Sequence, residues 1–275
     1  MHGLLLLALM AGAPGEKTFR LPDGVDLAYV ERGKGEPALV FIHCFSCRKE
    51  MWTETLAGFA GERRAVALDL PGHGRSGAGR QAWSIPGLGA DVAALVEHLK
   101  LGRVILVGNS LGGPVALEAA ARLGPRRVQG IVAVDTLHNV EQQWPEAEFK
   151  ATVDAFRADF ATTCTNFMLS LLPKDTPAAT RERVDRDTCG NDPTAALALF
   201  QTVRGHDQAA ALRAAGVPVW AINSTAFPSA LEVNRRHARS FELILMEGVG
   251  HYPQVERPAE FQAHLRRVIQ SLAAP

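Results

Sequence analysis

Short apolar runs alternate with stretches of helical periodicity along most of this chain. The runs are apolar throughout, which is typical of strands covered on both faces rather than on one. We expect strands at residues 38–42, 65–68, 104–107, 131–134, 217–222 and 243–246. Alternating strands and helices predict an α/β fold, with a mostly parallel central sheet flanked by helices.

Helical spacing is clearest in two segments. The first contains Ile85, Leu88, Val92, Leu95, Val96 and Leu99, and the second contains Phe261, Leu265, Val268, Ile269 and Leu272. Residues 27–30 follow a Pro22-Asp23-Gly24 turn and predict an early antiparallel strand.

The alternation stops between residues 138 and 212. This stretch has helical patterning and no convincing strand, and it is too long for a simple connection. We therefore expect a helical cap over residues 138–212 and an α/β core formed by residues 17–137 and 213–275. Ligands of α/β sheets bind at the carboxyl ends of the strands, so a cap there would shape a substrate pocket.

Overall charge argues against polyanionic partners. The 275 residues include 29 basic and 29 acidic side chains, which does not favour nucleic acid as a partner. No apolar run approaches the roughly 20 residues that span a bilayer. Residues 1–16 are expected to be an N-terminal extension or a signal peptide, because Leu4 to Met10 is apolar and Ala11-Gly12-Ala13 resembles a cleavage site. A signal peptide in residues 1–13 would imply a periplasmic or secreted protein, and its absence a cytoplasmic one.

Four cysteines are too few for a disulfide scaffold. Cys44 and Cys47 match C-x-x-C, but a metal site would need a second close ligand pair, so metal and redox functions are disfavoured. If the protein is exported, Cys164 and Cys189 are candidates for a disulfide.

The segment Arg103-Val-Ile-Leu-Val-Gly-Asn-Ser-Leu-Gly-Gly113 places G-x-S-x-G directly after an expected strand, and a helical segment, 114–122, follows. This is the context that a nucleophile elbow requires, because a tight strand-to-helix turn exposes the serine hydroxyl. Gly108 and Gly112 leave room where a Cβ would clash. Ser110 is therefore the candidate nucleophile.

Four segments together resemble the α/β-hydrolase fold superfamily, in its capped, esterase/lipase-like branch. They are FIHCFSC (41–47), ALDLPGHGRS (67–76), VGNSLGG (107–113) and GVGHYPQVERP (248–258). The resemblance covers residues 18 to 272. It is specific for the fold and much less specific for the substrate.

The resemblance assigns the general base to His251, in the loop between the last strand and the final helix. The acid departs from the family's usual position: the family usually carries it just after the strand at 217–222, whereas residues 217–230 contain no Asp or Glu. Asp135 ends the preceding strand at the same edge of the sheet, and some superfamily members carry their acid there. We expect Asp135 to complete the triad, with Glu232, Asp207 and Asp192 as competitors.

The resemblance also implies an oxyanion hole formed by the N–H groups of Phe45 and Leu111. The family usually has His-Gly where this chain has His43-Cys44, and the Cβ of Cys44 restricts the backbone and narrows the mouth of the hole. Cys44 as nucleophile is a remote alternative, because Ser110 already occupies the elbow.

These residues predict a serine hydrolase that cleaves carboxylic esters of small or medium acyl groups through an acyl-enzyme on Ser110. The alternatives are a lactonase, a carbon–carbon bond hydrolase or a perhydrolase with the same triad, and a non-catalytic ligand-binding member. The expected partner is a small-molecule ester or lactone. No cofactor or metal is implied, and the oligomeric state is left open.

Overall fold

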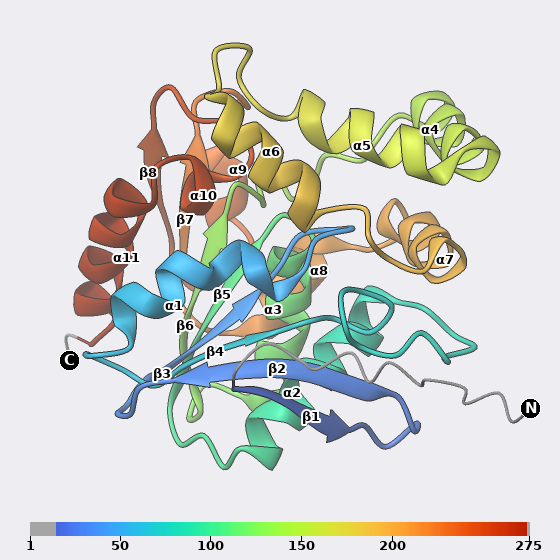
Figure 1. Ribbon diagram of the computed structural model, residues 1–275. Helices are drawn as coiled ribbons and strands as arrows, with labels where there is room; N and C mark the ends of the chain where they lie inside the picture. The colour runs from blue at the N-terminus through green and yellow to red at the C-terminus, as the bar shows by residue number, and fades with distance from the viewer. Residues whose placement is uncertain (1–14, 274–275) are drawn as a thin grey trace, which may run out of the picture.

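The computed structural model describes residues 15–273, which contain an eight-stranded sheet in the order β1-β2-β4-β3-β5-β6-β7-β8 (Figure 1). β2 runs antiparallel to β1 and β4, and the remaining pairs are parallel. The strands are β1 (Glu16–Arg20), β2 (Asp26–Arg32), β3 (Ala38–Ile42), β4 (Ala65–Leu68), β5 (Val104–Asn109), β6 (Val128–Val134), β7 (Val219–Ser224) and β8 (Phe241–Met246). The expected α/β fold is confirmed. The expected signal segment 1–13 lies outside the described residues.

Helices cover both faces of the sheet because the buried strands are apolar on both sides. In β3, Val40 and Ile42 pack into one hydrophobic core, whereas Leu39 and Phe41 pack into the other. The first core includes α2 (Ile85–His98), α3 (Gly112–Leu123) and α8 (Gln208–Ala215). The second includes α1 (Thr53–Phe59) and α11 (Pro258–Ala273), which stand together on one side of the sheet in Figure 1.

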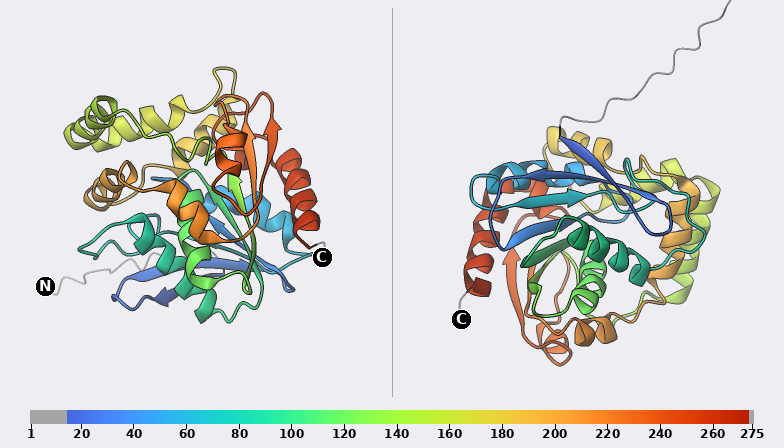
Figure 2. Two further views of the ribbon diagram at one scale, coloured as in Figure 1. Left: turned by 180° about the vertical axis from the view of Figure 1, so that it is seen from behind. Right: turned by 90° about the horizontal axis from the view of Figure 1, so that it is seen from below.

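A helical insertion connects β6 to β7. It contains α4 (Glu146–Ala158), α5 (Phe160–Ser170), α6 (Ala178–Asp187) and α7 (Pro193–Val203), and it ends with α8. In both views of Figure 2, α4 and α5 lie at the periphery of the molecule, away from the strands. α8 instead packs against α3, so the last helix of the insertion belongs to the layer that covers the sheet.

Short elements complete the chain. A 3-10 helix, η1 (Lys49–Trp52), precedes α1, while α9 (Leu231–Arg235) follows β7 and α10 (Pro253–Glu256) precedes α11. Among residues 15–273, no helix combines the length and the apolar character needed to cross a membrane.

Two disulfides are present. Cys164 in α5 is bonded to Cys189 after α6, which is the pairing considered from the sequence. Cys44 and Cys47 are bonded to each other, so the C-x-x-C motif closes a turn directly after β3. The insertion meets this turn through a bridge between Cys47 and Thr188 and a hydrogen bond from Cys189 N–H to Ser46 O of 2.7 Å.

Candidate active site

Ser110 lies in the turn between β5 and α3. Its φ of 52° is in the left-handed region, which non-glycine residues rarely adopt. Two backbone hydrogen bonds hold this conformation: Ser110 N–H donates to Val134 O at 3.0 Å, and Gly113 N–H donates to Ser110 O at 2.9 Å. Such a conformation is typical of a strained turn that presents one side chain to a cleft.

The turn requires glycine on both sides of the serine. A Cβ on Gly108 would lie 2.1 Å from Gly112 O, and a Cβ on Gly112 would lie 2.4 Å from Ile42 O. Both contacts are with backbone atoms that cannot move aside. The G-x-S-x-G pattern therefore reflects the close approach of β5, α3 and the end of β3.

Asp135 follows directly after β6 and also has a positive φ, 44°. Its backbone N–H donates to Ile222 O at 3.0 Å, which keeps the residue beside β7. Its carboxylate is fully buried, and Oδ1 accepts a hydrogen bond of 2.8 Å from the Ser224 N–H at the end of β7.

His251 contacts the other carboxylate oxygen, since its Nδ1 lies 2.6 Å from Asp135 Oδ2. An ionised carboxylate only accepts hydrogen bonds, so Nδ1 carries the proton and Nε2 of the neutral ring has the free lone pair. The His251 side chain is 13% exposed. The structure therefore brings together Asp135 and His251, which are 116 residues apart in the sequence.

The environment keeps Asp135 ionised. Burial alone would raise the pKa of this carboxyl. The hydrogen bond from His251 and the charge that this ring carries when protonated, with smaller contributions from His138 and Ser224 N–H, hold the pKa below the usual value of an aspartate. His138 Nε2 lies 3.8 Å from Asp135 Oδ1, and burial lowers the pKa of His138. Asp135 thus lies near two imidazoles and is in contact with one.

Two residues that the sequence reading did not identify fix the His251 loop. Asn109, next to the elbow serine, donates from Nδ2 to Val134 O at 2.9 Å and to His251 O at 3.1 Å. Glu256 accepts from Gly250 N–H at 2.8 Å and from Tyr252 N–H at 2.9 Å, on either side of His251. Asn109 lies in the VGNSLGG segment beside Ser110, and Glu256 lies in the GVGHYPQVERP segment beside His251. Nothing else in the sequence singles out either residue.

The competing acids make other contacts, although Asp207 lines the same cavity as Ser110 and His251. The Glu232 side chain is 78% exposed and pairs with Arg235. Asp192 and Asp207 accept hydrogen bonds from the first turns of α7 and α8, at the N-terminal ends of these helices. All three carboxylates therefore have surface or capping roles that account for them.

The two amides expected in the oxyanion hole lie on adjoining loops. Phe45 belongs to the turn after β3, and Leu111 precedes α3. Within residues 15–273, neither amide N–H has a hydrogen-bond acceptor. The Phe45 ring packs against His73, Phe156 and Phe200, so it links the loop to the insertion.

Ser110, Asp135 and His251 line one cavity of about 900 Å³. Trp144 and Phe227 supply its aromatic wall, while Glu141, Glu148, Arg204 and Asp207 make part of it polar. Phe156 and Phe200 of the insertion are buried in the core and do not line this cavity.

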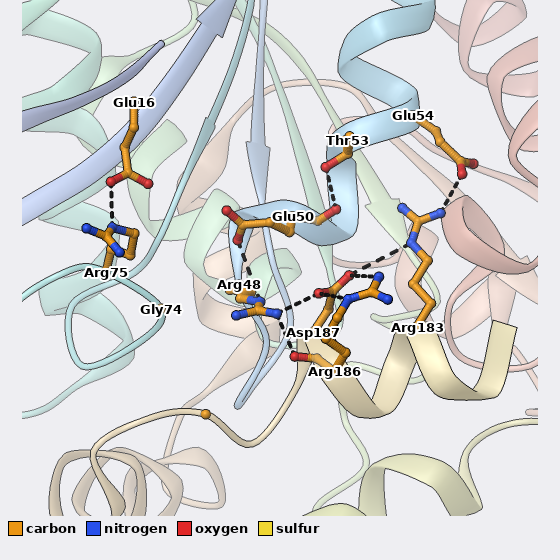
Figure 3. A pocket seen from close by; sticks show the side chains of 11 residues that line it. Glu16, Arg48, Glu50, Thr53, Glu54, Gly74, Arg75, Arg183, Arg186 and Asp187 are labelled. Atoms are coloured by element: carbon orange, nitrogen blue, oxygen red, sulfur yellow. Dashed lines mark hydrogen bonds and ion pairs between the residues drawn. The ribbon is translucent and has the colours of Figure 1, made fainter. Parts of the chain in front are cut away.

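A second cavity, of about 710 Å³, has a different character (Figure 3). Arg48, Arg183 and Arg186 surround the buried Asp187, Arg183 also pairs with Glu54, and Arg75 pairs with Glu16. Its charges largely neutralise one another, and it shares no lining residue with the first cavity. Among residues 15–273, no group of three or more His, Cys, Asp or Glu side chains is arranged to hold a metal ion.

Comparisons with known proteins show which family this chain belongs to. A family model described as "Alpha/beta hydrolase family" matches residues 39–263. A pimeloyl-[acyl-carrier protein] methyl ester esterase from Nitrosospira multiformis is 28% identical over 257 residues, covering 87% of this chain and 97% of the relative. An acetyltransferase component of the acetoin cleaving system from Pseudomonas putida is 39% identical over 99 residues, but the match spans only 36% of this chain and 26% of that protein.

Among solved structures, a thermophilic esterase from Thermogutta terrifontis superposes with a TM-score of 0.81 at 22% identity, covering 94% of this chain and 99% of that one. At this identity the likeness shows the fold alone. The family model, in contrast, spans most of the sequence, including the segments that carry Ser110, Asp135 and His251. The chain therefore belongs to the alpha/beta hydrolase family.

Proposed function

We propose that this protein is a serine hydrolase that cleaves carboxylic esters of small or medium acyl groups. The observation that carries the proposal is the 2.6 Å contact between His251 Nδ1 and Asp135 Oδ2 in the cavity that Ser110 also lines. A buried carboxylate that orients an imidazole beside an elbow serine is the arrangement that activates a hydroxyl for acyl transfer.

The reaction follows from the roles of these groups. Ser110 Oγ attacks the ester carbonyl while His251 Nε2 takes its proton, and the ionised Asp135 stabilises the imidazolium that forms. The N–H groups of Phe45 and Leu111 donate to the oxyanion of the tetrahedral intermediate. His251 then gives the proton to the departing alcohol. A water molecule, activated by the same imidazole, hydrolyses the acyl-enzyme.

A pre-steady-state assay tests the proposal. The wild-type protein is mixed with p-nitrophenyl esters of increasing acyl length, and we expect a burst of p-nitrophenol equivalent to the enzyme concentration if deacylation is slower than acylation. Ser110→Ala should abolish the burst and lower kcat by at least about 10³-fold, because it removes the nucleophile. Ser271→Ala, an exposed serine on α11, is the matched control and should behave as wild type.

Two results would contradict this function. A wild-type protein that binds esters without turnover would be a non-catalytic member of the family. Turnover that Ser110→Ala leaves intact would mean that another group is the nucleophile. The same assays should include lactones, substrates of carbon–carbon bond hydrolases and peracid formation, because these reactions use the same triad. Higher activity in one of them would change the substrate class that we assign.

A further inference from the structure

The peptide between Cys44 and Phe45 is held from its carbonyl side. Cys44 O lies 2.7 Å from His43 Nδ1 and accepts a hydrogen bond of 3.2 Å from Cys47 N–H. His43 Nε2 accepts from Leu70 N–H at 2.9 Å, so Nδ1 is the protonated nitrogen and donates to Cys44 O. A trans peptide is planar, with its C=O and N–H pointing in opposite directions. Fixing the Cys44 carbonyl therefore fixes the direction of the Phe45 N–H.

This loop lies directly against the nucleophile turn. A Cβ on Gly112 would lie 2.4 Å from Ile42 O and 3.0 Å from His43 O. Cys44 and Phe45 are the next two residues of the same loop. The Phe45 N–H, without an acceptor in the described part of the chain, is thus part of a loop that contacts the turn carrying Ser110 and Leu111.

The Cys44–Cys47 disulfide closes the same turn covalently. Its Cα atoms are 5.2 Å apart, and both cysteines are buried, at 1% and 0% exposure. The turn needs support, because Ser46 has a φ of 52°, which a non-glycine residue rarely adopts. The insertion supports the turn from outside, through the hydrogen bond from Cys189 N–H to Ser46 O and the bridge between Cys47 and Thr188.

We propose that the Cys44–Cys47 disulfide is a positioning element that keeps the Phe45 N–H in the orientation of an oxyanion donor. The inference rests on the proposed function, which assigns that role to Phe45. Cys44 lies where the family usually has glycine. The disulfide between Cys44 and Cys47 restricts the conformations of this loop, which would otherwise be more flexible. Loss of the bond would release the Cys47 N–H from the Cys44 carbonyl, leave only His43 to hold the Cys44–Phe45 peptide, and so misalign one of two donors.

The test compares two pairs of substitutions. Cys44→Ala with Cys47→Ala opens the turn. Cys164→Ala with Cys189→Ala removes the other disulfide and serves as the matched control, because residue 189 contacts Ser46 O through its backbone N–H, which alanine keeps. Loss of an oxyanion donor lowers kcat by about 10²–10³-fold. We expect a fall of this order in the first pair, with KM changed by less than about threefold, because the donor acts mainly in the transition state.

A trifluoromethyl ketone distinguishes positioning from a general loss of structure. This inhibitor forms a tetrahedral oxyanion with the serine, so its Ki should rise in the first pair by about the same factor as kcat/KM falls. The Ki for the second pair should stay within about threefold of wild type, even if that pair melts at a lower temperature. Circular dichroism establishes that each variant is folded.

If the alanine pair does not fold, Cys44→Gly with Cys47→Ser restores the glycine of the family and opens the same bond. Unchanged kcat and Ki in either folded variant of the turn would overturn the positioning role. A separate experiment tests the proposed function itself. Wild-type protein is treated with a p-nitrophenyl phosphonate, and mass spectrometry measures whether Ser110 is modified; an unmodified Ser110 would contradict the proposed function. That result would overturn the inference as well.

Discussion

The ends of β6 and β7 lie side by side, yet they contribute to the site in different ways. The two strands are parallel, and Val134, the last residue of β6, pairs with Ile222 of β7. β6 continues into Asp135, whose carboxylate meets His251. β7 ends with Asn223 and Ser224, and the backbone N–H of Ser224 donates to that same carboxylate. In this chain the carboxylate follows β6, and β7 supplies a backbone hydrogen bond that holds it.

The largest effect should come from removing the charge at the end of β6. Asp135→Asn keeps the size of the side chain but cannot stabilise the imidazolium of His251, and we expect kcat to fall by about 10⁴-fold. Steady-state kinetics on a p-nitrophenyl ester measures this. Circular dichroism should show an intact fold.

Glu232→Gln is the matched control beyond the end of β7. This carboxylate is largely exposed and pairs with Arg235, so its loss should change kcat by less than about twofold. The reverse pattern, with Asp135→Asn active and Glu232→Gln inactive, would place the acid after β7.

Asn109 connects the end of β6 to the His251 loop by two hydrogen bonds. Asn109→Ala should show how much these hydrogen bonds contribute to stability and to kcat. The substitution leaves Val134 O and His251 O without their shared donor, so we expect a loss of about 1–3 kcal/mol in the free energy of unfolding. We also expect kcat to fall by about tenfold, because His251 is less well held.

Asn223→Ala is the corresponding change on β7. Asn223 contacts the Thr136 backbone instead of His251. Its loss should cost similar stability in urea unfolding but change kcat by less than about threefold. Equal kinetic losses in both variants would mean that Asn109 acts only through stability.

Acid pH should lower the free energy of unfolding of the whole protein. The kinetics of the variants at the ends of β6 and β7 must therefore be compared near pH 7. Burial lowers the pKa of His43 to about 4, and burial with the nearby His43 lowers that of His73 to about 3. In the unfolded chain both titrate near pH 6.5. As the pH falls from 6.5 towards 4, the unfolded state therefore binds protons that the folded state does not bind, and the folded state loses stability.

Each of these two histidines should remove about 1.4 kcal/mol of unfolding free energy per pH unit within that window. Urea unfolding at pH 7, 5.5 and 4.5 measures the slope. His73→Gln should reduce the slope, and His98→Gln, which alters an exposed residue, should not. A stability that does not change between pH 7 and 4.5 would contradict the burial of neutral imidazoles.

The smallest effect should come from the Ser224 side chain. Within residues 15–273, Ser224 Oγ has no hydrogen-bond partner, and the contact with Asp135 uses the backbone N–H. Ser224→Ala should therefore change kcat by less than about twofold and leave stability nearly unchanged. A large kinetic loss would show that the hydroxyl takes part in the site.

The sequence predicted the buried strands well because their residues are apolar on both faces. β3 and β4 begin and end where expected, and β7 is displaced by two residues because Pro218 precedes it and polar Asn223 and Ser224 extend it. β1 was not predicted, since Glu16–Arg20 is an edge strand with mostly exposed residues and no buried pattern.

Contacts between distant segments were harder to predict. The link from Asn109 to His251 spans 142 residues, and that from Glu118 to His206 spans 88, and neither leaves a local pattern. The C-x-x-C motif was weighed as a metal or redox site, because the spacing alone does not show that the two cysteines close one buried turn.

A double-mutant cycle between Asp135 and His251 tests the central claim most directly, namely that the acid at the end of β6 acts through this imidazole. If it does, Asp135→Asn added to His251→Ala should lower kcat/KM by less than about threefold beyond His251→Ala alone. A further loss close to the roughly 10⁴-fold effect of Asp135→Asn in the wild-type background would show that the two residues act independently, and would contradict the account.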